Sequence, residues 1–211
     1  MALDKETLKL ADLIYTKASL KPMSKTLFFI SRVFLILNEV ENVNEVTSQN
    51  ISKLNKKLKL DTDSDYSFEK VLKDLGENLD EILKRVTSIF NSRQTDALGG
   101  VFNSLLRGKF EAGEGFGTFL TPEEVVGPCA ELLNGLFEKY GKVKKDDLFA
   151  DITGGTGSFM LNCYSIFKGK VPSKNFHILD QSRTHLGFAE SNFKLNFNSK
   201  PTTTYTEDSL L

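Results

Sequence analysis

The segment from Leu148 to Phe159 constrains the fold of this chain more than any other. Its apolar start predicts a short buried strand that ends in the acidic residue Asp151, and Thr-Gly-Gly-Thr-Gly follows before the next apolar run. A strand, a glycine-rich turn and a helix in this order are typical of α/β proteins with a parallel sheet. Glycines let backbone N–H groups approach a ligand closely, and the start of a helix adds positive potential. The segment therefore predicts a ligand site where the strand ends.

The spacing of these glycines excludes the two common phosphate-binding motifs. No Gly-Lys-Ser or Gly-Lys-Thr follows, so the segment is not a P-loop, and Met160 stands where the dinucleotide motif needs its third glycine. The carboxylate of Asp151 would repel a phosphate but suits a positively charged ligand. An acid followed by Gly-x-Gly at this spacing is the layout expected for S-adenosylmethionine, whose sulfonium is positive. A glycine-rich turn without any ligand explains this one motif equally well.

A second segment, upstream of the glycine turn, carries strong signals for the start of a helix. Thr121 suits the N-cap, Pro122 suits the first helical position, and Glu124 completes a capping box. Gly141 is expected to end this helix. Its apolar residues recur at helical spacing and predict one buried face. They are Val125, Val126, Cys129, Leu132, Leu133, Leu136, Phe137 and Tyr140.

Together the two segments resemble motifs of the DNA methyltransferases that modify the amino group of adenine. The closest likeness is to the methylation (M) subunit of type I restriction–modification systems. That family reads roughly Gly-x-Phe-Tyr-Thr-Pro upstream and Asp-Pro-x-Cys-Gly-Thr-Gly-Gly-Phe at the turn, which this chain matches at 117–122 and 151–159. Four positions depart from the pattern: Leu120 replaces tyrosine, Ile152 replaces proline, Gly154 replaces cysteine and Ser158 replaces glycine.

Further segments resemble the same family in the same order along the chain. Residues 176–181 resemble the second strand of the fold and contain Asp180, about 25 residues past the glycines, near the position of a ribose-binding carboxylate. The family has Gly-x-Glu here. Residues 189–196 resemble the helix that follows, and residues 207–210 resemble a Gly-Asp-Ser/Thr-Leu turn whose acid lies near the adenine of the cofactor. Four motifs in this order over 113–211 are far more specific than any one of them.

The resemblance implies an α/β protein: an N-terminal all-helical domain at 1–112, then at 113–211 the first half of a Rossmann-like S-adenosylmethionine-dependent methyltransferase fold. Thr121 would hold the methionine carboxylate of the cofactor and Asp151 its amino group. Asp180 would bind the ribose hydroxyls, and Asp208 the adenine amino group. The residues implied to bind the cofactor are Phe119, Thr121, Pro122, Asp151, Gly155, Thr156, Gly157, Phe159, Asp180 and Asp208.

The catalytic tetrapeptide of the family, Asn-Pro-Pro-Phe or Asn-Pro-Pro-Tyr, does not occur in this sequence, which contains no Pro-Pro pair. In the family it holds a target adenine flipped out of the duplex, and it follows the turn matched by Asp208. No catalytic residue is assigned, and the chain is expected to be the front part of a longer enzyme and inactive alone. That enzyme would transfer a methyl group to adenine N6 in DNA. Two alternatives fit the same pattern: a non-catalytic DNA-binding or subunit-assembly module with a vestigial cofactor fold, and a methyltransferase acting on RNA or protein.

The same resemblance predicts the order of the strands. The strand at 149–152 should have the strands around Ile178 and Tyr205 on one side and the catalytic strand on the other. Without the catalytic strand, the strand at 149–152 becomes an edge with unpaired N–H and C=O groups. The chain alone is therefore expected to be unstable, to self-associate or to borrow a strand.

Composition fits an ordinary protein of the cytoplasm. The net charge is −1, so no strongly basic surface is evident. The resemblance implies double-stranded DNA, a specificity subunit and other subunits of a restriction–modification complex as partners. Cys129 and Cys163 fall on predicted apolar helix faces and predict buried thiols in a reducing compartment. His177 and His185 lie at no metal-ligand spacing, so no metal site is expected. No secretory signal is evident, and the apolar run 27–37 is too short for a membrane span.

The N-terminal part of the chain has helical periodicity and little strand signal. Helices are expected at 4–18, 24–40, 43–60, 68–90 and 97–110, as in a helix bundle, before a glycine-rich connector at 108–117. In the resembled family this domain helps to contact DNA and neighbouring subunits. Four lysines cluster on one expected helix, and a solvated helix face is favoured over phosphate contacts. They are Lys53, Lys56, Lys57 and Lys59.

Overall fold

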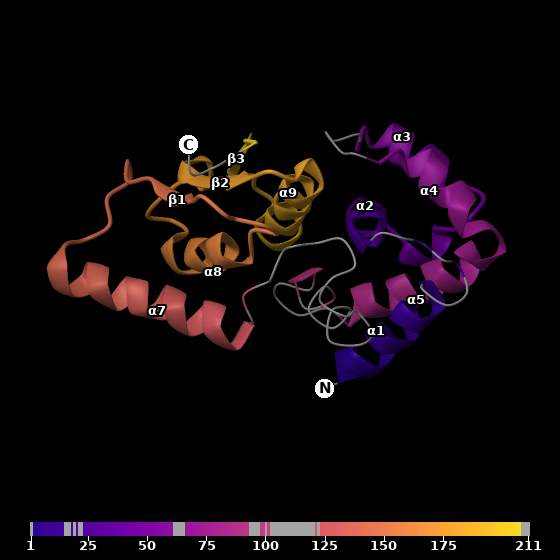
Figure 1. Ribbon diagram of the computed structural model, residues 1–211, viewed down its shortest axis with the longest axis horizontal. Coiled ribbons are helices and arrows are strands. Elements are labelled where there is room, and N and C mark those ends of the chain that lie inside the picture. The colour runs from indigo at the N-terminus through magenta and orange to yellow at the C-terminus, as the bar shows by residue number, and fades with distance from the viewer. Residues whose placement is uncertain are drawn as a thin grey trace. The chain divides into compact units, whose positions relative to one another are not determined.

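The computed structural model describes residues 2–14, 18, 20, 23–60, 66–92, 98, 99, 101, 121 and 123–207. The chain divides into two compact units, Met1–Gly117 and Thr118–Leu211. The α-helices and strands of both units are labelled in Figure 1. No helix in the described part of the chain is both long enough and apolar enough to cross a membrane.

The elements described in the first unit are helical. They are α1 (Ala2–Asp12), α2 (Met23–Glu39), the 3-10 turn η2 (Val43–Glu45), α3 (Ile51–Lys57), α4 (Phe68–Leu75), the 3-10 turn η3 (Gly76–Asn78) and α5 (Leu79–Asn91). Helix α5 packs against α1 and α2, and α2 also contacts α3 and α4. Every residue from 26 to 37 is buried. The apolar run at 27–37 is therefore a core helix, as the sequence predicts.

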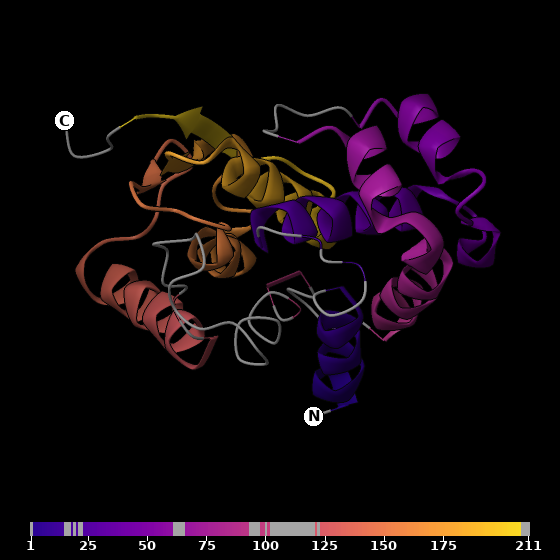
Figure 2. The same ribbon diagram turned by 45° about the vertical axis from the view of Figure 1, so that its right-hand side comes forward.

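The structure interrupts two helices that the sequence predicts as continuous. The helix expected at 68–90 is divided into α4 and α5 because Gly76 adopts φ 51° and ψ −131°, a conformation that residues with a Cβ rarely adopt. Figure 2 shows the change of direction between these magenta helices. The helix expected at 43–60 is reduced to η2 and α3. Asn42 accepts a hydrogen bond from the amide of Asn44, and Asn50 accepts one from that of Thr47, and such local bonds compete with helix formation.

Other predictions on the first unit are wrong in detail or fall outside the description. Helix α2 begins at Met23, one residue before the expected start at 24, and the hydroxyl of Ser24 lies 2.6 Å from that of Tyr66. Most of the helix expected at 97–110 and the whole connector at 108–117 lie outside the described residues.

The second unit is a parallel sheet covered by helices. Its elements are α7 (Glu123–Tyr140), β1 (Phe149–Asp151), α8 (Ser158–Phe167), the 3-10 turn η4 (Ser173–Asn175), β2 (Phe176–Asp180), α9 (Arg183–Phe197) and β3 (Thr202–Tyr205). The strands lie in the order β1-β2-β3 and all pairs are parallel, which is the predicted order. Asp151 pairs with Ile178, and Asp180 pairs with Tyr205. Within the described residues, β1 is paired on one side only.

The helices of this unit pack in sequence order. Helix α8 contacts β1 and β2, α9 contacts β2 and β3, and α7 packs against α8, as can be followed in Figure 1. Parallel strands need such helical crossovers, because a tight turn would make the next strand antiparallel. The carboxyl ends of β1 and β2 therefore lie side by side, each leading into a helix.

Stacked aromatic rings hold β1 to β2. The rings of Phe149 and Phe176, the first residues of the two strands, are nearly parallel with centroids 4.8 Å apart. The ring centroid of Phe167 in α8 lies 5.1 Å from that of Phe149, and the ring of Tyr164 packs edge-on against that of Phe176. Buried aromatic side chains of this size dominate the energetics of a small core. This packing fixes the register of the two strands from which the candidate site extends.

Of the eight residues on the predicted apolar face of α7, three are buried or pack against the core and five are exposed. Val126 and Ala130 are buried, and Leu133 and Phe137 pack against the core. A second stripe is exposed; it consists of Val125, Cys129, Leu132, Leu136 and Tyr140. Eight apolar positions cover a face wider than the single helix α8 fills. The prediction of a buried thiol is therefore wrong for Cys129 and right for Cys163.

Candidate functional site

The glycine turn joins β1 to α8, as the sequence predicts. The amide of Gly154 donates to the carbonyl oxygen of Leu179 (2.9 Å), which ties the turn to the end of β2, and the amide of Gly157 donates to the carbonyl of Gly154 (2.8 Å). Gly155 and Gly157 have φ values of 50° and 75°. Residues with a Cβ rarely adopt these values. The path of the turn therefore depends on glycine at both positions.

The three glycines differ in what surrounds them. A Cβ atom at Gly154 would overlap the Cγ2 methyl of Ile178, and one at Gly157 would lie 2.7 Å from the Cβ of Ala189. These two glycines let the turn pack tightly on β2 and α9. At Gly155, in contrast, a Cβ would meet no atom within 4 Å. The turn thus presents open space at Gly155 while its two neighbouring glycines are pressed against the protein.

This packing gives a reason for one departure from the family pattern. If Asp180 matches the glutamate of the family's Gly-x-Glu, Ile178 stands where the family has glycine. Gly154 stands where the family has cysteine. In the structure the Ile178 side chain fills the space that a side chain at 154 would need. In this chain, a bulky side chain at 178 on β2 is therefore accommodated by glycine at 154 in the turn.

Two carboxylates lie at the carboxyl ends of the adjacent strands. Asp151 ends β1, and its Oδ1 accepts a hydrogen bond from the amide of Thr153 (3.2 Å). Burial raises the pKa of Asp151 above its ordinary value; the Thr153 amide opposes this shift, and the charge of Asp180 adds to it. A positive charge placed beside Asp151 would stabilise its ionised form and so act against the effects of burial and of Asp180 on the pKa. The site is therefore electrostatically suited to a cationic ligand group.

The carboxylate of Asp180 is held by the backbone of the glycine turn and by α9. Its Oδ2 accepts from the amide of Gly155 (2.9 Å), and its Oδ1 accepts from the amide of Ser182 (2.7 Å) and lies 3.3 Å from Nδ1 of His185. Burial acts to raise the pKa of Asp180. The hydrogen bond and charge of His185, with the two amides, outweigh burial and hold the pKa below its ordinary value. The group is thus kept as a carboxylate.

Sequence reasoning missed the part that His185 plays here. The sequence assigns His185 no role, since it lies at no metal-ligand spacing, although Ser182 has the signature of an N-cap. In the structure Ser182 Oγ accepts from the amide of His185 (3.2 Å), which fixes the first turn of α9. A serine N-cap two residues after a strand-end acid, with a histidine three residues further, was the signal available.

The remaining predicted residues are distributed as follows. Thr156 is buried, and its hydroxyl lies 3.4 Å from that of Ser158. Phe159 packs against the core at the start of α8. Thr121 is exposed. Phe119, Pro122 and Asp208 lie outside the described residues.

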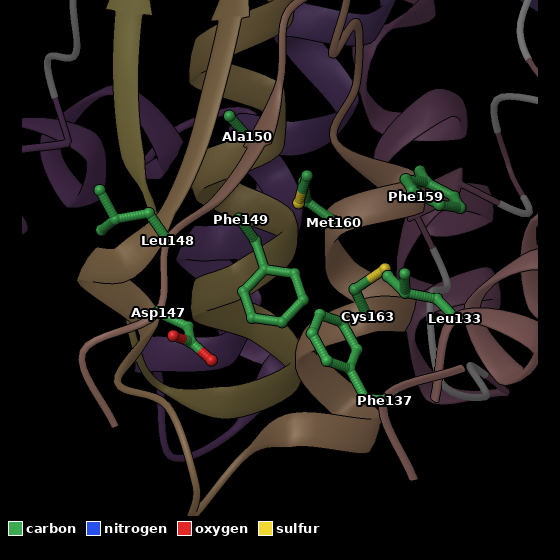
Figure 3. A pocket seen from close by; sticks show the side chains of 9 residues that line it. All are labelled: Leu133, Phe137, Asp147, Leu148, Phe149, Ala150, Phe159, Met160 and Cys163. Atoms are coloured by element: carbon green, nitrogen blue, oxygen red, sulfur yellow. The ribbon is translucent and has the colours of Figure 1, made fainter. Parts of the chain in front are cut away.

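An apolar pocket of about 430 Å³ lies between α7, α8 and the start of β1, apart from the two carboxylates. Figure 3 shows its lining, with the ring of Phe137 facing that of Phe149; their centroids are 5.8 Å apart. Cys163 also lines it. Burial, with smaller effects from the charges of Asp151 and Cys129, raises the pKa of Cys163 to about 12. Its thiol therefore stays protonated and is a packing group rather than a nucleophile.

No group of three or more His, Cys, Asp or Glu side chains is placed to hold a metal ion in the part of the chain that the structure describes. Of the two histidines, His177 lies within β2 and His185 lies beside Asp180.

Solved structures similar to this chain include methyltransferases and restriction–modification enzymes. One is a protein of Listeria monocytogenes assigned to the class I S-adenosylmethionine-dependent methyltransferases (18% identity, TM-score 0.45, 89% of this chain and 54% of that one). Another is the Type ISP restriction–modification enzyme LlaGI, solved as a nuclease-deletion mutant with a DNA substrate mimic (17% identity, TM-score 0.48, 97% of this chain and 23% of that one). A third is DrdV in complex with DNA (15% identity, TM-score 0.47, 98% of this chain and 24% of that one). The chain thus spans about half the length of the first and about a quarter of the other two.

Sequence comparison is more direct. No curated protein matches the chain at a significant level. The family model described as N-6 DNA methylase matches residues 93–211, which is more than half of the 211 residues. The matched region includes β1, the glycine turn, β2 and both carboxylates of the candidate site. The chain therefore belongs to the N-6 DNA methylase family.

Proposed function

We propose that this chain is the cofactor-binding part of an adenine-N6 DNA methyltransferase of a restriction–modification system. The observation that carries the proposal is the pair of carboxylates, Asp151 and Asp180, on either side of a glycine turn that leaves open space at Gly155. Family membership supports the reaction class. S-adenosylmethionine supplies a methyl group on a positively charged sulfur when it is bound.

The residues fit such a cofactor in charge and in shape. Oδ1 of Asp151 accepts a hydrogen bond from the amide of Thr153, and the pKa of Asp151 is raised. The ammonium group of the methionine part would therefore stabilise the ionised form of this acid. The open space at Gly155 allows ligand atoms to approach the backbone. Asp180 is kept ionised to accept from the ribose. These features together support a ligand that is cationic at one end and carries hydroxyl groups.

The other residues implied by the resemblance complete the proposed site. Thr121 would bind the methionine carboxylate at the start of α7, where the helix dipole favours an anion, and Phe119 and Pro122 would shape the same turn. Gly157, Thr156 and Phe159 would position the start of α8, and Asp208 would bind the adenine amino group. Double-stranded DNA, a specificity subunit and the other subunits of such a complex are the proposed partners.

Calorimetric titration of the 211-residue chain with S-adenosylmethionine tests the proposal. We expect binding by the wild type and a loss of about 10- to 150-fold in Asp151→Ala, the range for one hydrogen bond to a charged group. The matched control is Asp146→Ala, because Asp146 is exposed just before β1, and it should bind as the wild type does. A folded Asp151→Ala variant with unchanged affinity would refute the assigned site.

A further inference from the structure

The side chain of Asp180 is 11% exposed and that of His185 only 6%. Three groups from two parts of the chain, the glycine turn and the start of α9, reach this carboxylate. Gly155 of the glycine turn donates to Oδ2, while Ser182, the N-cap of α9, and His185 in the first turn of α9 reach Oδ1. The carboxylate is therefore bound on both oxygens before any ligand arrives.

The number of acceptor positions limits what this carboxylate can bind. An ionised carboxylate offers roughly four acceptor positions, two on each oxygen. Oδ1 uses both of its positions on Ser182 and His185, and Oδ2 uses one on Gly155. The donors found among the described residues leave one position, on Oδ2. A ribose that presents two neighbouring hydroxyls would find an acceptor for only one of them.

His185 is well placed to keep the carboxylate in this orientation. Its own amide is bound by the Ser182 hydroxyl, so the backbone that carries the imidazole is fixed relative to the N-cap. Without the imidazole, Oδ1 would have an acceptor position free, and the carboxylate could turn to accept two hydroxyls. Asp151 on β1 repels Asp180 and provides no alternative donor.

We propose that His185 is a positioning residue that, with the Gly155 amide, holds Asp180 so that one position of Oδ2 accepts a single ribose hydroxyl of the cofactor. This inference rests on the proposed function and specifies how that site recognises the sugar. His185 does not itself contact the cofactor; it acts through Asp180.

The test is to titrate the full chain with S-adenosylhomocysteine and with its 2′-deoxy and 3′-deoxy forms. One deoxy form should bind about 10- to 150-fold more weakly than the parent, and the other within about threefold of it. Equal losses with both forms, or no loss with either, would overturn the inference while leaving the proposed function in place. Failure of the parent compound to bind would instead contradict the proposed function, and the inference with it.

Variants of His185 separate positioning from folding. In His185→Leu the preference between the two deoxy forms should fall to within about threefold, because Oδ1 can then accept the second hydroxyl. His185→Asn keeps an N–H donor near the position of Nδ1 and should restore the wild-type preference. His177→Asn is the matched control, since His177 lies half-buried within β2. A folded His185→Leu variant that keeps the full preference would refute the role of His185. If that variant does not fold, the relative binding of the two deoxy forms to the wild type still tests the inference that Asp180 accepts a single hydroxyl.

Discussion

The contact between Gly154 and Ile178 makes a quantitative prediction. Gly154 does not have positive φ, so alanine there is free of backbone strain and would otherwise stabilise the fold by about 0.4–1 kcal/mol through the unfolded state. The added Cβ, however, would overlap the Cγ2 methyl of Ile178 and lie 3.5 Å from its Cβ and 3.4 Å from the carbonyl oxygen of Asp151. Carbon atoms prefer separations of about 3.5–4.0 Å. Ile178 is fully buried, so it cannot swing into solvent, and Gly154→Ala should destabilise by about 1–3 kcal/mol.

A double-mutant cycle isolates this contact. Ile178→Ala removes the clashing methyl and should cost about 2–5 kcal/mol alone. The double variant should be more stable than the sum of the single effects predicts, by about 1–3 kcal/mol, since the alanine at 154 enters the space vacated at 178.

Native-state hydrogen exchange of the β2 amides is the assay, because it reads the free energy of opening of the second unit separately from the first. Gly135→Ala is the control: Gly135 lies in α7 with no atom within 4 Å of an added Cβ, and it should stabilise by about 0.5–1 kcal/mol. Additive single effects, or a Gly154→Ala variant as stable as the wild type, would refute the packing argument.

Three further predictions follow from the described residues. Because burial raises the pKa of Asp151, its ionised form costs stability above that pKa, so Asp151→Asn should melt higher than the wild type at neutral pH without cofactor. The difference in melting temperature between the variant and the wild type should narrow as the pH falls, and an unchanged difference would contradict this explanation. Leu148 is 68% exposed beside the edge of β1 that no described strand pairs with. Leu148→Lys should therefore reduce self-association in sedimentation, and a wild type that is monomeric would contradict this prediction. Replacing the lysine cluster with glutamine should leave the salt dependence of DNA binding unchanged, and a drop of about two units or more in slope would show phosphate contacts. That cluster consists of Lys53, Lys56, Lys57 and Lys59.

The sequence predicts the second unit well because its signals are local. An acid at the end of a short apolar run, followed by closely spaced glycines, leaves few alternatives to a strand, a turn and a helix. The structure has β1, the turn and α8 at these positions, and the strand order β1-β2-β3 agrees with the one that the resemblance implies. Local chemistry and the family pattern agree here, so the prediction needs no knowledge of distant contacts.

The helical unit was predicted less well because periodicity does not reveal where a helix is interrupted. The apolar spacing from Phe68 to Phe90 continues across Gly76, yet the backbone there leaves the helical region. Similarly, the apolar positions of α7 fit one broad face, but only the residues facing α8 and the core are buried. Cys129 lies on the other side of that face. Burial depends on how many neighbours a helix has, and a single amphipathic pattern does not specify that number.

The candidate site shows the same division. Asp151 and Asp180 could be selected from sequence, because each ends a predicted strand. The hydrogen bonds that orient Asp180 could not, since they join residues 25 positions apart and a histidine that carries no motif. The contact between Gly154 in the turn and the Ile178 side chain on β2 could not be predicted from the sequence either, because neither residue alone indicates it.

Hydrogen exchange with and without S-adenosylmethionine tests the central claim most directly, since it reports both whether the cofactor binds and where. At a cofactor concentration about 100 times Kd, binding can slow exchange by up to about 100-fold. We expect this protection to be concentrated at 153–158 and 179–182, the glycine turn and the end of β2, and to be lost in Asp151→Ala. Absence of protection at saturating cofactor, or protection confined to residues 23–60, would contradict cofactor binding at this site.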